Sequence, residues 1–288
     1  MVERGIIRDR TVVLELTSRN IKKQYRGSVL GVVWTILNPL LTMLVMWFVF
    51  STLFGRGQFY PLYLLCGNVV FSSFRSCTTT SLTSIQQNRN SMLRTKIHAY
   101  VFPCSLALST LINFALSLIA LIPFMIWKSV EVQNLFTWRL IFIVFMIPAF
   151  WAFTYGISLL LAVLYVFFRD LKNIYNVFVL LWQYLTPIFY TVDRFSTTKN
   201  PAGPIALKVI KLNPMFHFTN YLRECVYLGV AGIDKYYPGY VEGDKVGFIG
   251  AYAPEFKTLL ILYASGILAT LIGVAVYELM KDKMMVRL

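Results

Sequence analysis

Residues 29–54 read VLGVVWTILNPLLTMLVMWFVFSTLF and contain no charged side chain. Because a helix rises about 1.5 Å per residue, about 20 apolar residues cross a hydrocarbon core of about 30 Å. Runs of this kind are helical, since barrel strands alternate over about ten residues. Five similar runs follow at residues 61–85, 100–127, 140–168, 171–192 and 258–279. Arg75 interrupts the first of them, and Lys172 and Glu278 lie near an end of the last two. The sequence therefore predicts an all-α integral membrane protein with six transmembrane helices.

The distribution of charge predicts how these helices are oriented. The chain is 57% hydrophobic and only 14% charged, yet its net charge is +14, a balance that can also indicate nucleic-acid binding. The basic residues, however, gather before the first run, after the second and fourth runs, and in the tail 280–288. Positive charge near span ends stays cytoplasmic. We therefore expect both termini in the cytoplasm, residues 193–257 outside, and no nucleic acid as a partner.

Residues 1–28 are predicted to form a cytoplasmic amphipathic helix. Helical spacing places Arg19, Lys22, Lys23 and Arg26 on one basic stripe. Such a stripe can lie along an anionic leaflet and contact its lipid headgroups. The alternative is that these residues are ordinary topology-setting charges without a dedicated contact.

Two further segments differ from the spans. The link between the second and third runs has a short amphipathic pattern, which indicates either a helix that docks onto a partner subunit or a solvated turn; its residues are Asn90, Met92, Leu93, Arg94, Lys96 and Ile97. Region 193–257 contains two apolar stretches separated by Asn213-Pro214, a pair that favours the start of a turn. Two short re-entrant helices are expected there, before the last span.

The sequence contains no recognisable catalytic machinery. It lacks the G-x-x-x-x-G-K-[ST] phosphate loop, and neither His98 nor His217 has a metal-ligand cluster near it. No acidic residue lies deep in a predicted span, so the parts of a carboxylate proton relay are missing. We therefore expect no catalytic residue, no bound metal and, from the cysteine positions, no disulfide framework.

One charged residue, Arg75, lies inside a predicted span. Placing a cation in lipid costs about 2.5–3.5 kcal/mol on insertion scales, so Arg75 should face a wet cavity or a partner. It is expected either to contact an anion, such as a phosphate of a lipid-linked substrate, or to bond to neighbouring helix carbonyls. The aromatic residues deep in the spans present a similar choice between stacking on sugars in a channel and packing between helices.

Several motifs resemble, in order along nearly the whole chain, the ABC-2 type polysaccharide-export permeases. These are the transmembrane subunits that move O-antigen, capsule, teichoic acid and related lipid-linked glycans. Each motif alone is weak, but the ordered set is fairly specific for the family, not for its cargo. The motifs are KQYRGSVLG at 23–31, Trp34, LNPL at 37–40, FVFS at 48–51, PLYLLCG at 61–67, FRDL at 168–171 and LNPM at 212–215.

The resemblance implies six spans per chain, two chains forming one pore, and two copies of a separate cytoplasmic subunit that binds ATP and Mg²⁺. This chain would then bind no cofactor itself, and residues 90–99 would be its coupling helix. Spans one and five line the pore in this family, which would place five residues near the substrate: Trp34, Asn38, Tyr175, Trp182 and Tyr184. The chain departs from the family pattern in GNVVF at 67–71 and at Arg75, where a neutral residue is more usual.

Together these features predict the permease subunit of an ABC transporter, not an enzyme, in a bacterial plasma (inner) membrane. The expected cargo is a cell-surface polysaccharide linked to a lipid of the undecaprenyl-diphosphate type, such as O-antigen, teichoic acid or capsule. ATP hydrolysis in the separate subunit would drive its export. The alternatives are an ABC-2 exporter of drugs or simple lipids, and a membrane enzyme acting on lipid-linked sugars, for which catalytic carboxylates are missing.

Overall fold

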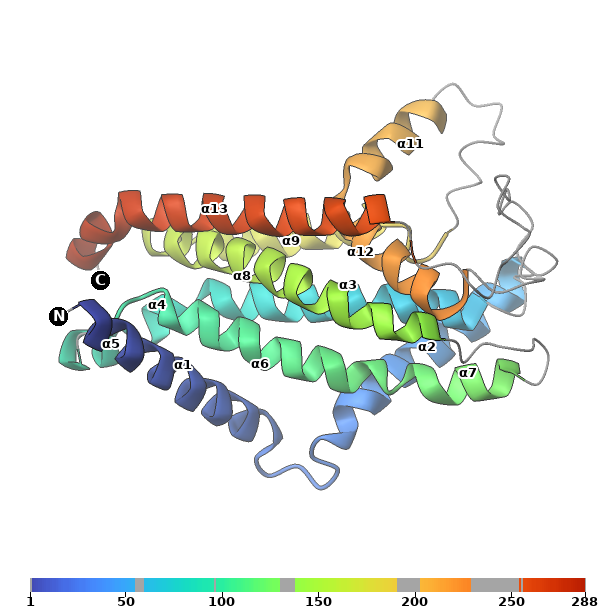
Figure 1. Cartoon of the computed structure of the whole chain (residues 1–288), viewed down its shortest axis with the longest axis horizontal. Coiled ribbons are helices and arrows are strands. Elements are labelled where there is room, and N and C mark those ends of the chain that lie inside the picture. The colour runs from blue at the N-terminus through green and yellow to red at the C-terminus, as the bar shows by residue number, and fades with distance from the viewer. Residues whose placement is uncertain are drawn as a thin grey trace.

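The computed structural model describes residues 2–54, 60–95, 97–129, 138–190, 203–228, 254 and 256–287. Within these ranges all regular structure is helical, which confirms the predicted all-α class. The long helices run side by side, and both chain ends lie at the same end of the bundle (Figure 1). The elements are α1 (Val2–Tyr25), α2 (Val33–Phe54), α3 (Tyr60–Leu82), α4 (Ser84–Gln87), α5 (Arg89–Thr95), α6 (Val101–Leu118), α7 (Leu121–Ser129), the 3₁₀ helix η1 (Trp138–Phe142), α8 (Ile143–Phe167), α9 (Leu171–Leu185), α11 (Gly203–Leu212), α12 (Pro214–Arg223), the π-helix η2 (Glu224–Leu228) and α13 (Phe256–Arg287).

Three helical stretches of the described chain are long and apolar enough to cross a membrane. They are Val101–Trp127, which comprises α6 and α7, Trp138–Phe167 and Phe256–Arg287. These stretches confirm the third, fourth and sixth predicted runs as spans by length and composition. The first run corresponds to α2, which is apolar over the shorter stretch Val33–Val49. The complete set of six spans stays a prediction.

The helices end at different residues from the predicted spans, for local reasons. α2 begins at Val33 and not at residue 29, because Gly31 has a φ of +48°, a left-handed conformation that a helix does not include. α9 ends at Leu185 because Thr186 is extended, with a ψ of 126°. Thr186 precedes a proline, and residues in that position avoid the helical region. α13 continues to Arg287, so the predicted tail is helical as far as it is described.

The closest helix packing in the bundle joins α8 to α13, and glycine makes it possible. A Cβ atom added at Gly156 would lie 2.3 Å from the backbone carbon of Ala269, and one added at Gly273 would lie 2.5 Å from the Gly156 carbonyl oxygen. Because the two backbones approach this closely, Thr270 of α13 donates a hydrogen bond of 2.8 Å to the Ala152 carbonyl of α8. Small residues at such a crossing are a usual means of packing helices in membranes.

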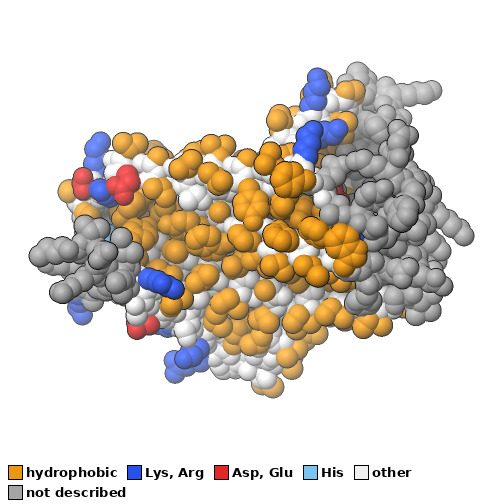
Figure 2. Space-filling model, viewed as in Figure 1, with side chains coloured by type: hydrophobic (Ala, Val, Ile, Leu, Met, Phe, Trp, Pro, Cys, Tyr) orange, Lys and Arg blue, Asp and Glu red, His pale blue; other side chains and the backbone are white. Residues whose placement is uncertain are grey.

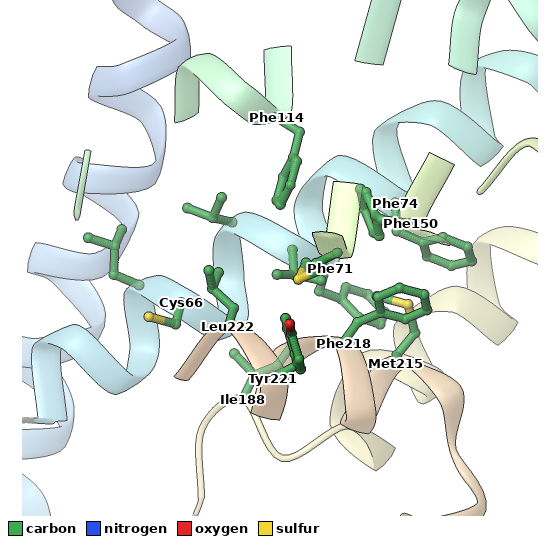
Figure 3. Packing of buried hydrophobic residues seen from close by; sticks show 14 of the residues in the cluster. Cys66, Phe71, Phe74, Phe114, Phe150, Ile188, Met215, Phe218, Tyr221 and Leu222 are labelled. Atoms are coloured by element: carbon green, nitrogen blue, oxygen red, sulfur yellow. The ribbon is translucent and has the colours of Figure 1, made fainter. Parts of the chain in front are cut away.

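The expected pair of short helices is present as α11 and α12, one on each side of Asn213. The Asn213 side chain accepts a hydrogen bond from the Met215 amide (3.0 Å) and so caps the start of α12. α12 packs into the main core, where the Phe218 ring lies 5.5 Å from the ring of Phe150 and 5.4 Å from that of Phe153 (Figure 3). Entry of this pair into the outer leaflet stays a prediction, and residues 191–202 and 229–253 lie outside the described residues.

The surface of the molecule separates apolar from charged regions. Hydrophobic side chains cover the middle of the face seen in Figure 2, while acidic and basic side chains gather towards the end that carries the termini, with further basic ones on α11. Large apolar side chains along α13, including Leu260, Leu268 and Leu271, are about 60% exposed. An apolar belt with charge at its edges is what a membrane-embedded bundle requires.

Candidate functional site

The mid-span arginine, Arg75, is exposed on the side of α3 that faces α9. One of its guanidinium nitrogens donates a 3.3 Å hydrogen bond to Oε1 of Gln183 in α9. The partner of its side chain is therefore another side chain and not a helix carbonyl. The side chain is not buried in the core. A cation exposed at this depth needs water, an anion or a partner chain. Contact of Arg75 with an anion of the substrate stays a prediction.

A small, largely apolar cavity with a few polar groups lies beside this contact, between α2, α3 and the end of α9. It has a volume of about 40 Å³, and its lining residues are Thr42, Met43, Met46, Leu64, Asn68, Gln183 and Phe189. Gln183 thus joins Arg75 to the cavity, and Asn68 belongs to the stretch in which the chain departs from the family pattern. A cavity with amide and hydroxyl groups can hold water in the bundle. These polar groups lie beside Arg75, one of the residues predicted to contact the substrate.

The residues predicted to line the pore fall into two groups. Trp34, Asn38 and Tyr184 are exposed on α2 and α9, and their side chains are free to meet a substrate or a second chain. Tyr175, by contrast, is buried and donates to the Thr78 hydroxyl over 2.7 Å. Trp182 is partly buried and donates through Nε1 to Oδ1 of Asn213 over 2.8 Å. Tyr175 and Trp182 therefore have contacts within the chain, and their place in the pore stays a prediction.

The predicted coupling segment, residues 90–99, includes most of the short helix α5, which follows α4 at the end of the bundle that carries the termini (Figure 1). Asn90 and Arg94 are exposed, whereas Met92 is 2% exposed. Met92 and Ile97 line a half-open groove of about 290 Å³ whose opposite wall is the end of α13, including Tyr277, Met284 and Met285. Lys96 and the side chain of Leu93 lie outside the described residues. The arrangement gives this end of the molecule an apolar groove beside an exposed helix.

The predicted basic stripe is exposed, as an interfacial helix requires. Arg19, Lys22 and Lys23 lie on α1, and Arg26 follows its last residue. The opposite face of α1 packs on α6 through polar groups. Thr17 donates to the Ser105 carbonyl over 3.3 Å, and the Asn20 amide donates to the Ser105 hydroxyl over 3.4 Å. Contact of the stripe with lipid headgroups stays a prediction.

The KQYRGSVLG motif forms the connection between α1 and α2. Tyr25 donates a 2.8 Å hydrogen bond to Oδ1 of Asn113 in α6 and also bonds to the Thr35 hydroxyl in the first turn of α2. Gly27 and Gly31 have φ values of +78° and +48°, which side chains rarely adopt. The motif therefore fixes the angle at which the chain turns from α1 into α2.

A buried arginine, Arg223, was not identified from the sequence. Its side chain is 1% exposed and lies 3.5 Å from the centre of the Tyr63 ring. It donates to the Pro187 carbonyl over 2.9 Å, where α9 has ended. A Cβ atom at Gly67 would lie 2.8 Å from its guanidinium, which explains the glycine of the PLYLLCG motif. Arg223 is a charged residue within the apolar stretch that follows Asn213. This position could have indicated from the sequence that its side chain is buried and needs polar partners.

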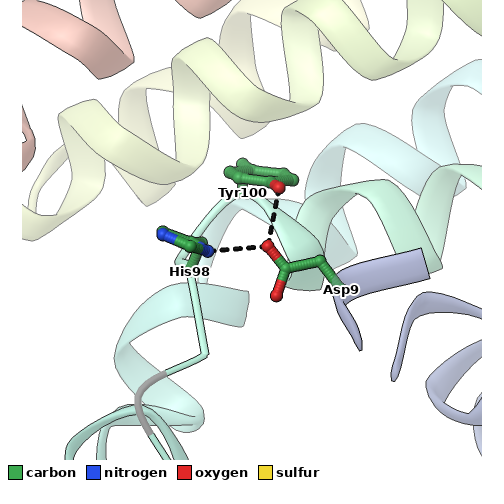
Figure 4. A network of polar contacts seen from close by, with 3 residues as sticks. All are labelled: Asp9, His98 and Tyr100. Carbon is green, nitrogen blue, oxygen red and sulfur yellow. Dashed lines mark hydrogen bonds and ion pairs between the residues drawn. The ribbon is translucent and has the colours of Figure 1, made fainter. Parts of the chain in front are cut away.

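A buried carboxylate, Asp9, was also not identified from the sequence. It is 4% exposed, and its Oδ2 atom accepts from the Tyr100 hydroxyl over 2.8 Å and lies 2.6 Å from Nδ1 of His98 (Figure 4). Both partners precede α6: His98 lies near the end of the predicted coupling segment, and Tyr100 follows it directly. Within the described part of the chain no three histidine, cysteine or acidic side chains gather as a metal site. The cluster is therefore a polar connection between two segments.

The comparisons with known proteins agree with this arrangement. A family model described as ABC-2 type transporter matches residues 11–227. The O-antigen export system permease protein RfbA of Myxococcus xanthus is 29% identical over 213 residues, 74% of this chain and 78% of its own. Two proteins of the same name from Klebsiella pneumoniae are 27% and 25% identical over 283 residues, each covering 96% of this chain and 94% of its own. Since the family model matches well over half of its residues, this chain belongs to the ABC-2 type transporter family of membrane proteins.

Proposed function

We propose that the chain is the permease subunit of an ABC exporter that moves a lipid-linked polysaccharide, of the O-antigen kind, across the bacterial inner membrane. The observation that carries this proposal is the match over 96% of the chain to relatives named O-antigen export system permeases. The sequence has no phosphate loop. ATP and Mg²⁺ therefore belong to a separate cytoplasmic subunit, two copies of which serve a dimer of this chain.

The groove between α5 and α13 is the site proposed to receive the ATP-binding subunit. Its walls are largely apolar, with Lys281 and Asp282 also among its lining residues, so it suits an apolar segment with polar flanks. Groove recognition of this kind depends on a few buried anchors. Arg94 is exposed on α5 and offers a charged contact beside the groove.

The substrate path is proposed to lie between two chains, along the exposed faces of α2 and α9. Phe48 is 72% exposed on α2, and Val177 and Leu181 are 61% and 64% exposed on α9, so each chain has an apolar surface that a second copy can cover. Arg75 would meet the phosphate groups of the lipid carrier through charge-assisted hydrogen bonds. Trp34 and Tyr184 would present ring faces to the passing sugars.

The test is reconstitution of the purified chain with the ATP-binding subunit encoded beside it. Hydrolysis of ATP is expected only in the complex and is expected to change when lipid-linked glycan is added. Met285→Glu, which places a charge in the groove, should weaken binding of the ATP-binding subunit at least about tenfold, because a lone carboxylate is costly in an apolar contact. The matched control is Val286→Glu, since Val286 is 88% exposed and does not line the groove.

Two results would contradict the proposal. ATP hydrolysis that is insensitive to glycan, but changes with drugs or simple lipids, would indicate a different cargo. Failure of the unchanged chain to bind any ATP-binding subunit would indicate that it is not the permease of an ABC transporter.

A further inference from the structure

Asp9 occupies a position that stability does not explain. The carboxylate is 4% exposed, and one of its oxygens, Oδ1, has no hydrogen-bond partner within the described part of the chain. Burying a charged group is costly, and replacing a buried ionic pair by apolar side chains of similar size is often neutral or even stabilising. An apolar residue at this position would serve the fold at least as well, so the carboxylate calls for a different explanation.

The partners of Asp9 lie at the exit of the coupling segment. His98 and Tyr100 stand between the last residue of α5, Thr95, and the first residue of α6, Val101. Their rings stack on each other with centres 5.6 Å apart, and the Tyr100 ring meets the ring of Tyr277 in α13 at 5.8 Å. His98 and Tyr277 also line the groove proposed to receive the ATP-binding subunit. Any displacement of α5 must act directly on this short stretch.

From Asp9, α1 forms a continuous series of contacts that ends at α2. Thr17 bonds to Ser105 in α6, Gln24 accepts from the Asn113 side chain over 2.8 Å, and Tyr25 bonds to both Asn113 and Thr35. Thr35 lies in the first turn of α2, next to Trp34. A single helix therefore joins the exit of the coupling segment at one end to the proposed substrate path at the other.

We propose that Asp9 is a positioning residue of the transport cycle: by holding His98 and Tyr100, it fastens α1 to the coupling segment, so that movement of α5 is passed along α1 to α2. This inference rests on the proposed function, because the ATP-binding subunit supplies the movement. Asp9 itself lines neither the groove nor the small cavity beside Arg75, and it reaches the groove only through its contact with His98. Its loss should therefore separate ATP hydrolysis from export while leaving assembly intact.

The test compares Asp9→Leu with the unchanged chain, each assembled with the ATP-binding subunit. Leucine has the same branched arrangement of side-chain heavy atoms as aspartate, although its two methyl groups are bulkier than the two oxygens, and it removes both contacts made by Oδ2. We expect unchanged binding of the ATP-binding subunit and continued ATP hydrolysis. The amount of glycan exported per ATP should fall about tenfold, because the variant loses hydrogen bonds to a charged group. Glu15→Leu is the matched control, since Glu15 is an exposed carboxylate on the same helix.

Two further readouts separate coupling from structural damage. Tyr100→Phe should lower the export ratio in the unchanged chain but not further in Asp9→Leu, because both variants remove the same contact. Val33 is 49% exposed at the start of α2 and can be replaced by a cysteine as a probe. This cysteine should react with a maleimide at a rate that depends on the nucleotide bound to the ATP-binding subunit. Asp9→Leu should abolish that dependence.

Three outcomes would overturn the inference. An unchanged export ratio in Asp9→Leu, or a nucleotide-dependent rate at residue 33 that persists in this variant, would show that α1 does not carry the movement. Joint loss of thermal stability and of binding to the ATP-binding subunit would show that Asp9 is only structural. Failure of the unchanged chain to bind that subunit would overturn the proposed function as well, and the binding measurement identifies this case by itself.

Discussion

Replacing Gly156 with alanine tests the packing between α8 and α13. The added Cβ atom would lie 2.3 Å from the Ala269 backbone carbon, whereas ordinary van der Waals contact begins at 3.4 Å. Because the obstructing atoms are backbone and not a flexible side chain, the helices must separate locally by about 1 Å. The bond from Thr270 to Ala152, now 2.8 Å, would then exceed the length at which a hydrogen bond survives.

The expected loss in the free energy of unfolding is about 2–3 kcal/mol. Overpacking of a close contact costs about 1–3 kcal/mol, and an interhelical hydrogen bond in a membrane protein contributes about 0.6 kcal/mol on average. For a chain of this length the loss corresponds to a fall in Tm of about 5 °C or more. The measurement is thermal unfolding of the purified protein in detergent, followed by a probe of the folded state.

Ala264→Leu is the control for this prediction. Ala264 lies on the exposed side of α13, so a larger side chain there adds volume without meeting α8, and its Tm should stay close to that of the unchanged protein. If Gly156→Ala shifted Tm no more than Ala264→Leu, the close approach of the two helices would be refuted.

Two further substitutions test the two arginines. Arg223→Met should lower the free energy of unfolding by about 2–3 kcal/mol, because it removes a buried stacking contact with Tyr63 and a hydrogen bond to Pro187. The control is Arg94→Met, at an exposed position. Equal Tm values for the two variants would contradict a stabilising role of Arg223. Arg75→Ala should lower the rate of glycan export about tenfold with expression intact, since a hydrogen bond to a charged group is worth about 1.5–3 kcal/mol, while Arg75→Lys should retain part of the rate. Full export by Arg75→Ala would exclude the phosphate contact.

The sequence predicts the helical elements better than their contacts. Long apolar runs identify the spans because every backbone group in lipid must be bonded within its own segment, and the pair Asn213-Pro214 separates α11 from α12 as expected. The turn from α1 into α2 follows from glycines whose positive φ is not visible in hydropathy. For the same reason α2 begins later than the predicted span, whereas α9 ends early because Thr186 is extended before a proline.

The candidate site was only partly predictable, since its contacts join residues far apart in the chain. Periodicity places Tyr175 and Trp182 on α9, but it does not indicate that Thr78 and Asn213 will engage them. Asp9 and His98 were unremarkable as single residues, and their contact appears only when α1 packs on α6. The exposure of Arg75, by contrast, agrees with the reasoning that a cation inside a span needs a wet or charged surrounding.

The most direct measurement is translocation of the polysaccharide itself in vesicles that contain the chain and its ATP-binding subunit, oriented with the ATP sites outward. Lipid-linked glycan is added to the outer leaflet, and the fraction protected from an external glycan-cleaving enzyme is followed after addition of ATP. The proposed function predicts protection that grows only with hydrolysable ATP and is reduced in Arg75→Ala. Protection that does not depend on ATP, or none at all in an assembled and hydrolysing complex, would contradict it.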